Sequence, residues 1–230
     1  MTLLGEGAVC IWNDVAPEGR EEFYAWHETE HMPERVGILG FLRGRRYTAL
    51  DAPTEWFTLY ETQTTDVLAG PAYLDRLDHP TDWTRRTNRH FRNTARALTR
   101  VAVRHGLADG GLLLACGLAG EGDLHGRLQG LFDGELLPLL QDDRRVCAAQ
   151  LCLTDRASST IETAEKAGRQ IGVPDAVILV EASRQAVLGA WAGELRERLA
   201  TLGDAAFSHE PGLFRLEIEI LAPLHPVATV

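Results

Sequence analysis

The chain has 230 residues, of which 45% are apolar and 24% are charged, a balance that suits one large globular domain or two small ones. Its net charge of −10 argues against a broad surface for nucleic acid or acidic membranes. Among 22 arginines there is a single lysine, Lys166, which excludes a Gly-x-x-x-x-Gly-Lys phosphate loop. Imine chemistry would have to use that lysine, whose polar neighbours do not suggest a desolvated amine.

The first residues lack the basic and apolar segments of a secretion signal, and no apolar run reaches the roughly 20 residues that span a bilayer. The four cysteines show no C-x-x-C spacing, which indicates reduced and mostly buried thiols. We therefore expect a cytoplasmic protein with no membrane and no nucleic-acid partner. The sequence leaves a homodimer open.

Hydrophobic periodicity predicts the order β-α-β-β-α-β for the first half of the chain. The expected elements are a strand 7–13, a helix 20–34, strands 41–49 and 55–62, a mainly helical segment 66–92 and a strand 99–105. On the first helix, Phe23, Trp26, His27 and His31 fall on one face. Pro33 is expected to end this helix soon after His31.

The second half repeats the same order of elements. The expected elements are a strand 111–118, a helix 124–140, strands 146–153 and 176–181, a helix 184–202 and a strand 214–221. Adding 105 to the numbers of residues 27–33 gives residues 132–138, where the Glu and the Pro recur at the same places. This internal match favours a duplication.

Two such units predict an α+β fold, in which two tandem β-α-β-β-α-β ferredoxin-like units form a pseudo-dimeric α/β barrel with its helices outside. The predicted units are residues 1–107 and 108–230. Packing the two helix-free sheet faces together would bury both of them in one core. The alternative is two separate split-β-α-β domains side by side.

At four matched positions, an imidazole or guanidinium group of the first unit has no ionisable counterpart in the second. The matched pairs, first unit before second, are His27/Phe132, His31/Leu136, Arg45/Gln150 and Arg46/Leu151. Buried imidazole and guanidinium groups cost free energy unless they are paired, so their presence indicates a function. We expect a small-molecule site in the first unit and a mainly structural second unit.

Residues 27–31 also match the H-E-x-x-H pattern, in which two histidines one helical turn apart bind zinc. Three features weaken this match: the expected helix end at Pro33, the charged Glu30 between the histidines, and the lack of a clear third ligand. Another metal use of the pair stays open, as does heme bound through His31 or His90. So does a structural reading, with one histidine at the surface and the other paired with a carboxylate.

The segment Trp26-His27-x-x-Glu30-His31-x-Pro33, followed by Gly40-Phe41 and Arg45-Arg46-Tyr47, resembles the EthD-like group of dimeric α/β-barrel proteins. The motif match covers about residues 8–62, and the repeated order of elements extends the architectural likeness over most of the chain. Related barrels include cofactor-free polyketide cyclases and monooxygenases, muconolactone-type isomerases and heme-binding proteins. The resemblance implies His31, with Arg46 and Tyr47, as site candidates. This chain departs from the group by fusing two units of which only one is polar.

We predict a cofactor-independent acid/base enzyme, of the cyclase, dehydratase, isomerase or decarboxylase type, acting on a small hydrophobic carbonyl or aromatic compound. The predicted catalytic residues are His31, Arg46 and Tyr47. The predicted substrate-binding residues are Trp26, His27, Arg45, Trp56 and Tyr60. A neutral histidine can move a proton at carbon next to a carbonyl, and an arginine can hold a carboxylate or a developing enolate.

Strand alternation limits this set, because adjacent Arg45 and Arg46 point to opposite faces and Tyr47 shares a face with Arg45. One alternative function is a non-catalytic small-molecule-binding or stress-associated barrel protein. A lesser alternative is a metal- or heme-dependent enzyme that uses His27 and His31.

A run of seven arginines between residues 85 and 104 is the second polar feature of the first unit. It could bind an anionic group such as a phosphate, or RNA. It could equally be a solvated helix face neutralised by Asp75, Asp78 and Asp82. The sequence leaves both readings open.

Overall fold

The computed structural model describes residues 3–223 and shows one closed barrel of eight antiparallel strands. Around the barrel the strands follow the order β1-β3-β2-β8-β5-β7-β6-β4. The strands are β1 (Gly7–Val15), β2 (Phe41–Asp51), β3 (Trp56–Thr62), β4 (Phe91–Gly106), β5 (Leu112–Ala119), β6 (Val146–Thr154), β7 (Ala176–Ala182) and β8 (Ala206–Leu221). The predicted pseudo-dimeric barrel is therefore confirmed over the alternative of two separate domains.

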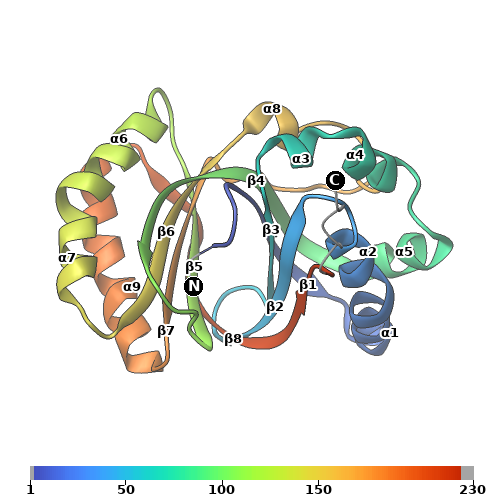
Figure 1. Ribbon diagram of the computed structural model, residues 1–230, viewed down its shortest axis with the longest axis horizontal. Coiled ribbons are helices and arrows are strands. Elements are labelled where there is room, and N and C mark those ends of the chain that lie inside the picture. Colours follow the sequence, from blue (N-terminus) through green and yellow to red (C-terminus); the bar gives the residue numbers. More distant parts are fainter. Residues whose placement is uncertain (1–2, 224–230) are drawn as a thin grey trace, which may run out of the picture.

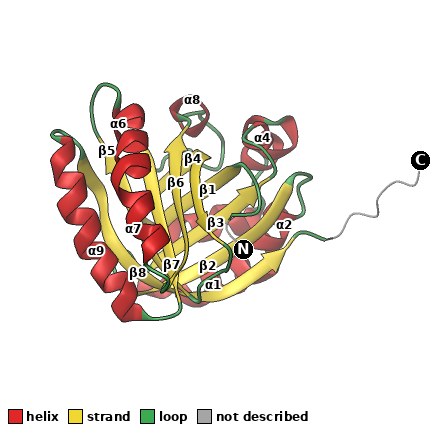
Figure 2. Cartoon of the chain, turned by 60° about the vertical axis from the view of Figure 1, so that its left-hand side comes forward, coloured by secondary structure: helices red, strands yellow, loops and turns green. Residues whose placement is uncertain are grey.

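The helices lie outside the barrel in two groups, one on each side (Figures 1 and 2). Those of the first unit are η1 (Pro17–Gly19), α1 (Arg20–Trp26), η2 (His27–His31), α2 (Met32–Val36), α3 (Asp66–Ala69), α4 (Pro71–Asp78), α5 (Asp82–Thr87) and η3 (Asn88–His90). Those of the second are α6 (Leu124–Leu131), η4 (Phe132–Leu136), α7 (Leu137–Asp142), α9 (Gln185–Leu199) and η5 (Ala200–Leu202). The short helix α8 (Arg156–Ser159) also belongs to the second unit but lies beside α3 of the first (Figure 1). Within residues 3–223, every helix is too short or too polar to cross a bilayer.

The duplication is visible element by element. The starts of β1 and β5 are 105 residues apart, as are those of β2 and β6, while β3 and β7 differ by 120 and β4 and β8 by 115. The π-helical segments η2 and η4 also differ by 105. The boundary after residue 107 falls between β4 and β5, and the division into two units there stays a prediction.

The first helix does not end at Pro33, which corrects the prediction. It continues through α2 to Val36, after a π turn in which the Met32 N–H donates to the carbonyl of His27, five residues back. This wider turn shifts the hydrogen-bond register just before Pro33, which has no N–H to place, so the proline is tolerated. Pro138 follows η4 in the same way.

Strands β4 and β8 each begin eight residues earlier than predicted. Pro211 lies within β8 at the point where the pairing with β5 shifts register, so the ladder does not need a backbone N–H there. The extra length closes the barrel. The first part of β4 pairs with β1 of its own unit and the last part with β6 of the other, and β8 joins β5 to β2 likewise.

The barrel interior is one core shared by both units. Trp12, Phe57 and Leu59 of the first unit pack there with Leu179 and Phe214 of the second. Large apolar side chains that both sheets turn inward supply most of the burial that holds the two units together.

Candidate functional site

A small cavity of about 60 Å³ lies outside the barrel, between the first unit's sheet and its helices. We call it the inner chamber. Helix segment η2 supplies His27 and His31 to its wall, and β3 supplies Thr58 and Tyr60. By the 10–15 Å³ that one water needs, it holds about four to six water-sized groups. The chamber can therefore enclose only the reacting end of a ligand.

His31 is buried against this chamber, with 7% of its surface exposed. Its ring lies 4.3 Å from the Trp26 ring and 5.7 Å from the His27 ring, centre to centre. Its Nδ1 is buried without a hydrogen-bond partner among the described residues. Burial, assisted by the positive charge of Arg35, holds the pKa of His31 well below its usual value, so the imidazole is neutral. A neutral ring with a free nitrogen is able to accept a proton.

Two further polar groups in the chamber wall lack partners. The Tyr60 hydroxyl and the Asn13 side-chain amide nitrogen are both buried and make no hydrogen bond within residues 3–223. Burial raises the pKa of Tyr60 far above its usual value, so the hydroxyl keeps its proton and can donate it. Buried polar atoms are nearly always satisfied, and three unpaired ones around one cavity indicate a place for a polar ligand.

Cationic side chains surround the chamber. Arg35 is held at 2.5 Å by Glu165, and Arg96 donates to the Tyr73 hydroxyl at 2.5 Å. Lys166 also lines the wall, which corrects the expectation that its amine is not desolvated. Burial lowers the pKa of Lys166 to about 8, while its amine donates to two backbone carbonyls at 2.7 Å.

Glu165, Lys166 and Arg169 come from the second unit, on residues 155–175 between β6 and β7. We call this connection the strap; the corresponding turn of the first unit, residues 52–55, is far shorter. The strap crosses to the first unit near α3 and α4 (Figure 1). There Gly172 exchanges backbone hydrogen bonds of 2.8 and 2.9 Å with β4. The second unit thus lines the same cavity as the first, and a mainly structural role for that unit stays a prediction.

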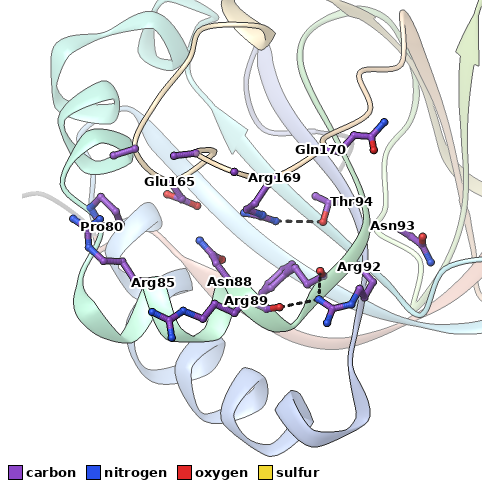
Figure 3. Close-up of a pocket in the computed structure, with 14 residues that line it drawn as sticks. Pro80, Arg85, Asn88, Arg89, Arg92, Asn93, Thr94, Glu165, Arg169 and Gln170 are labelled. Atoms are coloured by element: carbon purple, nitrogen blue, oxygen red, sulfur yellow. Dashed lines mark hydrogen bonds between the residues drawn. The ribbon is translucent and has the colours of Figure 1, made fainter.

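A larger hollow of about 500 Å³ adjoins the inner chamber. We call it the outer chamber. The two chambers share Asn88, Phe91, Thr94, Glu165 and Arg169. Figure 3 shows Glu165 and Arg169 reaching in from the strap, opposite Asn88, with other arginines around the edge. The strap and the α5–β4 segment form its two sides.

The structure brings together four of the eight predicted site residues: Trp26, His27, His31 and Tyr60 all line the inner chamber. Arg46 lies beside them without lining it. Its guanidinium donates to Nδ1 of His27 at 3.3 Å and pairs with Glu28 at 2.6 Å and with Glu217 at 3.0 Å. Arg46 therefore positions the helix that carries the histidines, and burial together with its charge keeps His27 neutral by lowering that pKa.

The other predicted residues lie elsewhere. Arg45 and Tyr47 face the barrel interior, on the side of β2 opposite to the inner chamber. Arg45 forms ion pairs there with Glu61 of its own unit at 3.0 Å and with Glu181 of the second unit at 3.1 Å. Tyr47 packs in the shared core with its hydroxyl unpartnered among the described residues. Trp56 packs beneath α1 against Phe23.

Sequence reasoning missed several chamber residues, among them Asn13, Arg35, Glu165, Lys166 and Arg169, while it included Arg96 only as part of the arginine run. One signal was available for those on the strap. The second unit has a 21-residue connection where the first has four residues, and an insertion of that length in a duplicated fold is typical of a functional loop.

The pattern His27-Glu28-Thr29-Glu30-His31 does not assemble a zinc-protease site. Glu28 pairs with Arg46, and Glu30 accepts a hydrogen bond from the Thr81 hydroxyl at 2.6 Å. In the part of the chain that is described, no three His, Cys, Asp or Glu residues gather in a metal-binding arrangement.

Heme also fails to fit the residues present. The inner chamber beside His31 is far smaller than the roughly 300 Å³ at which ligand pockets begin. The outer chamber is large enough, but no described histidine lines it, and His90 belongs to neither wall.

No family model matches the chain, and no curated protein matches its sequence. Solved structures do match over nearly its whole length. An anthrone oxidase-like protein has a TM-score of 0.64 at 10% identity, covering 97% of this chain and 96% of that one. The chlorite dismutase of Candidatus Nitrospira defluvii, in complex with imidazole, has a TM-score of 0.56 at 10% identity, with 92% and 91% covered.

A heme-binding protein from Thermus thermophilus has a TM-score of 0.50 at 10% identity, covering 95% of this chain and 93% of that one. The structural similarity establishes the fold, while sequence identities this low leave the activity open. The closer EthD-like resemblance stays a prediction within that fold. The closed barrel, the repeated units and these full-length matches show that the chain has the fold of the dimeric α/β-barrel proteins, with both halves of the barrel in one polypeptide.

Proposed function

We propose that the protein is an enzyme that removes a proton from carbon next to a carbonyl group in a small molecule, with His31 as the general base. One observation carries this proposal: a neutral imidazole with an unpartnered nitrogen borders a small chamber whose wall holds further buried polar atoms without partners among the described residues. A structural histidine normally satisfies its ring nitrogens.

The reaction begins with the substrate carbonyl in the inner chamber. A ring nitrogen of His31 takes the proton from the neighbouring carbon, and the C–H electron pair moves onto the carbonyl oxygen as an enolate. The Tyr60 hydroxyl donates a hydrogen bond to that oxygen, and the nearby guanidinium groups of Arg35 and Arg96 stabilise its negative charge. His31 then returns the proton.

The place of proton return decides the product. Return to another carbon isomerises the substrate, and return to a β-hydroxyl that leaves as water dehydrates it. If the enolate carbon attacks a second carbonyl, the substrate is cyclised and the proton returns to the new alkoxide. All three outcomes draw on the same proton transfer and need no further reactant.

A second candidate is oxygenation, which the fold-level likeness to an anthrone oxidase-like protein favours. Here the carbanion formed by His31 reacts with molecular oxygen, and the resulting hydroperoxide loses water. A CH2 group and O2 thus give C=O and H2O. This route differs from the first in consuming oxygen.

Deuterium uptake from solvent tests the proton transfer common to both candidates. Anthrone, phenylpyruvate and its neutral analogue phenylacetone serve as carbon acids, followed by NMR in D2O, with an oxygen electrode to detect the oxidase reaction. We expect enzyme-dependent exchange that His31→Leu lowers by about 10²-fold or more, the usual share of a general base. The variant copies Leu136 at the matched position of the second unit, so it should fold.

Tyr60→Phe should slow exchange while leaving ligand binding intact, because it removes one hydrogen bond to the enolate. Arg144→Gln, on the far helix layer, is the control that should exchange normally. Exchange by His31→Leu at the wild-type rate would remove His31 from the mechanism. Saturable binding of these compounds with no exchange in any of them would support the non-catalytic binding protein instead.

A further inference from the structure

The outer chamber holds an excess of positive charge in an acidic protein. Its charged lining residues are Arg85, Arg89, Arg92, Arg169 and Glu165. The glutamate is already neutralised, because its carboxylate pairs with Arg35 at 2.5 Å. Four guanidinium groups therefore face this hollow without a carboxylate of their own among its lining residues.

The contacts of these arginines agree with this excess. Arg85 and Arg89 make no ion pair or side-chain hydrogen bond within residues 3–223, and Arg92 donates only to the carbonyls of Arg89 and Phe91, at 2.8 Å each. The aspartates expected to neutralise these arginines form no ion pair with them in the described chain. Asp75 pairs with His79, Asp78 accepts from the Ala164 N–H, and Asp82 forms no ion pair in the described chain.

Arg169 is the best-placed of the four. Its Nη2 donates to the Thr94 hydroxyl at 3.2 Å, and its guanidinium lies 5.0 Å from the centre of the Phe91 ring. These contacts fix its direction while leaving donors free. A half-buried guanidinium without an anion costs free energy, since water has been removed and no opposite charge replaces it.

A hollow on the opposite side of the molecule shows that arginine richness alone does not explain this. That hollow, of about 610 Å³ between α7 and α9, contains two arginines with Asp142, Asp143 and Glu194. Its cations are balanced by acids, whereas those of the outer chamber are not.

We propose that the outer chamber binds the anionic group, a carboxylate or a phosphate, of the molecule whose reacting carbon enters the inner chamber. The binding of the anion is argued from the unbalanced arginines of the outer chamber alone. The link to reaction at His31 rests on the proposed function. The substrate class is accordingly an organic acid or phosphate ester with a carbonyl a few bonds from its charge.

The anion also helps the base. Arg35 and Arg169 both act against a charged His31 in the empty chamber. An anion paired with Arg169 offsets part of that repulsion, so the imidazole gains basicity when the ligand is in place. A neutral analogue of the substrate would neither raise the basicity of His31 nor gain the binding energy of an ion pair with Arg169.

Calorimetric titration of the full chain tests the anion site without any assay of turnover. The probes are phenyl phosphate, benzoate, inorganic phosphate and the neutral benzyl alcohol. We expect saturable binding of the anions that weakens as NaCl is raised, with benzyl alcohol at least about tenfold weaker. The ratio between phenyl phosphate and benzoate tells which anion the chamber prefers.

The double variant Arg85→Gln/Arg169→Gln should weaken anion binding by about tenfold or more, and Arg144→Gln in the balanced hollow should leave it unchanged. The anion site would be overturned if the double variant bound anions as tightly as the wild type, or if Arg144→Gln weakened anion binding as much as the double variant does. An affinity for benzyl alcohol equal to that for benzoate would overturn it too. His31→Leu should keep anion binding. Anion binding without exchange in the wild type would therefore defeat the proposed function while the anion site stands.

Discussion

Burial keeps His27 and His31 neutral at a pH where a histidine in water takes up a proton. Both pKa values are lowered, chiefly by burial, so the unfolded chain binds protons more readily than the folded one below about pH 6.5. Their effect on stability is therefore absent above that pH and becomes unfavourable as the pH falls. Phe132 and Leu136, at the matched positions, carry no such dependence.

We predict that the free energy of unfolding falls below pH 6.5, by up to about 1.4 kcal/mol per pH unit for each histidine. Urea denaturation at several pH values measures this. In the double variant His27→Phe/His31→Leu the slope should be smaller, with His209, whose pKa burial also lowers, contributing to what remains. An unchanged slope in the double variant would mean that the two imidazoles are not buried.

Alternation along β2 predicted correctly that Arg45 and Tyr47 share one face and Arg46 the other. It could not tell which face meets the helices, because residues 43–47 are buried on both sides of the strand. The placement of Arg45 and Tyr47 in the barrel interior therefore had to come from the three-dimensional structure.

At the scale of whole strands, Arg45 forms one ion pair within the first unit and one that joins it to the second. Arg45 on β2 bridges Glu61 on β3 and Glu181 on β7, which occupy matched positions 120 residues apart. Both carboxylates are fully buried. Removing one partner of a buried pair leaves an uncompensated charge, which costs far more than the loss of a surface pair.

We predict that Arg45→Gln, which copies Gln150 of the second unit, lowers the free energy of unfolding by about 3–5 kcal/mol. Arg196→Gln, which breaks an exposed pair with Glu210, should cost less than about 1 kcal/mol. Urea denaturation at pH 7 compares the two. Similar costs for both variants would show that Arg45 does not bridge buried carboxylates.

Helices and strands could be predicted where their apolar residues recur at a regular spacing. The helix bearing His31 and most of the strands were found within a few residues, but the first halves of β4 and β8 were missed. The first half of β4 begins with four residues of which three are polar, and that of β8 includes Pro211, so pairing with β1 and β5 decides that they are strands. The strap has no periodicity at all, so its crossing to the other unit could not be inferred.

Over the whole molecule, the two repeated units form the barrel, and the candidate site lies in the part where they differ. Repeated element order and the 105-residue offset predicted the barrel, because two helix-free sheets can bury each other only face to face. The same offset located the polar unit. It did not reveal that the second unit's strap completes the cavity, since the strap has no counterpart in the first.

The most direct test of this account is an NMR titration of the protein labelled at its histidine rings, with and without phenyl phosphate. The His31 signal, assigned with His31→Leu, should show a pKa well below 6.5 that rises when the ligand binds. His125 and His209, in the second unit, should not respond to it. An ordinary pKa for His31, or a ligand response confined to the second unit, would contradict the account.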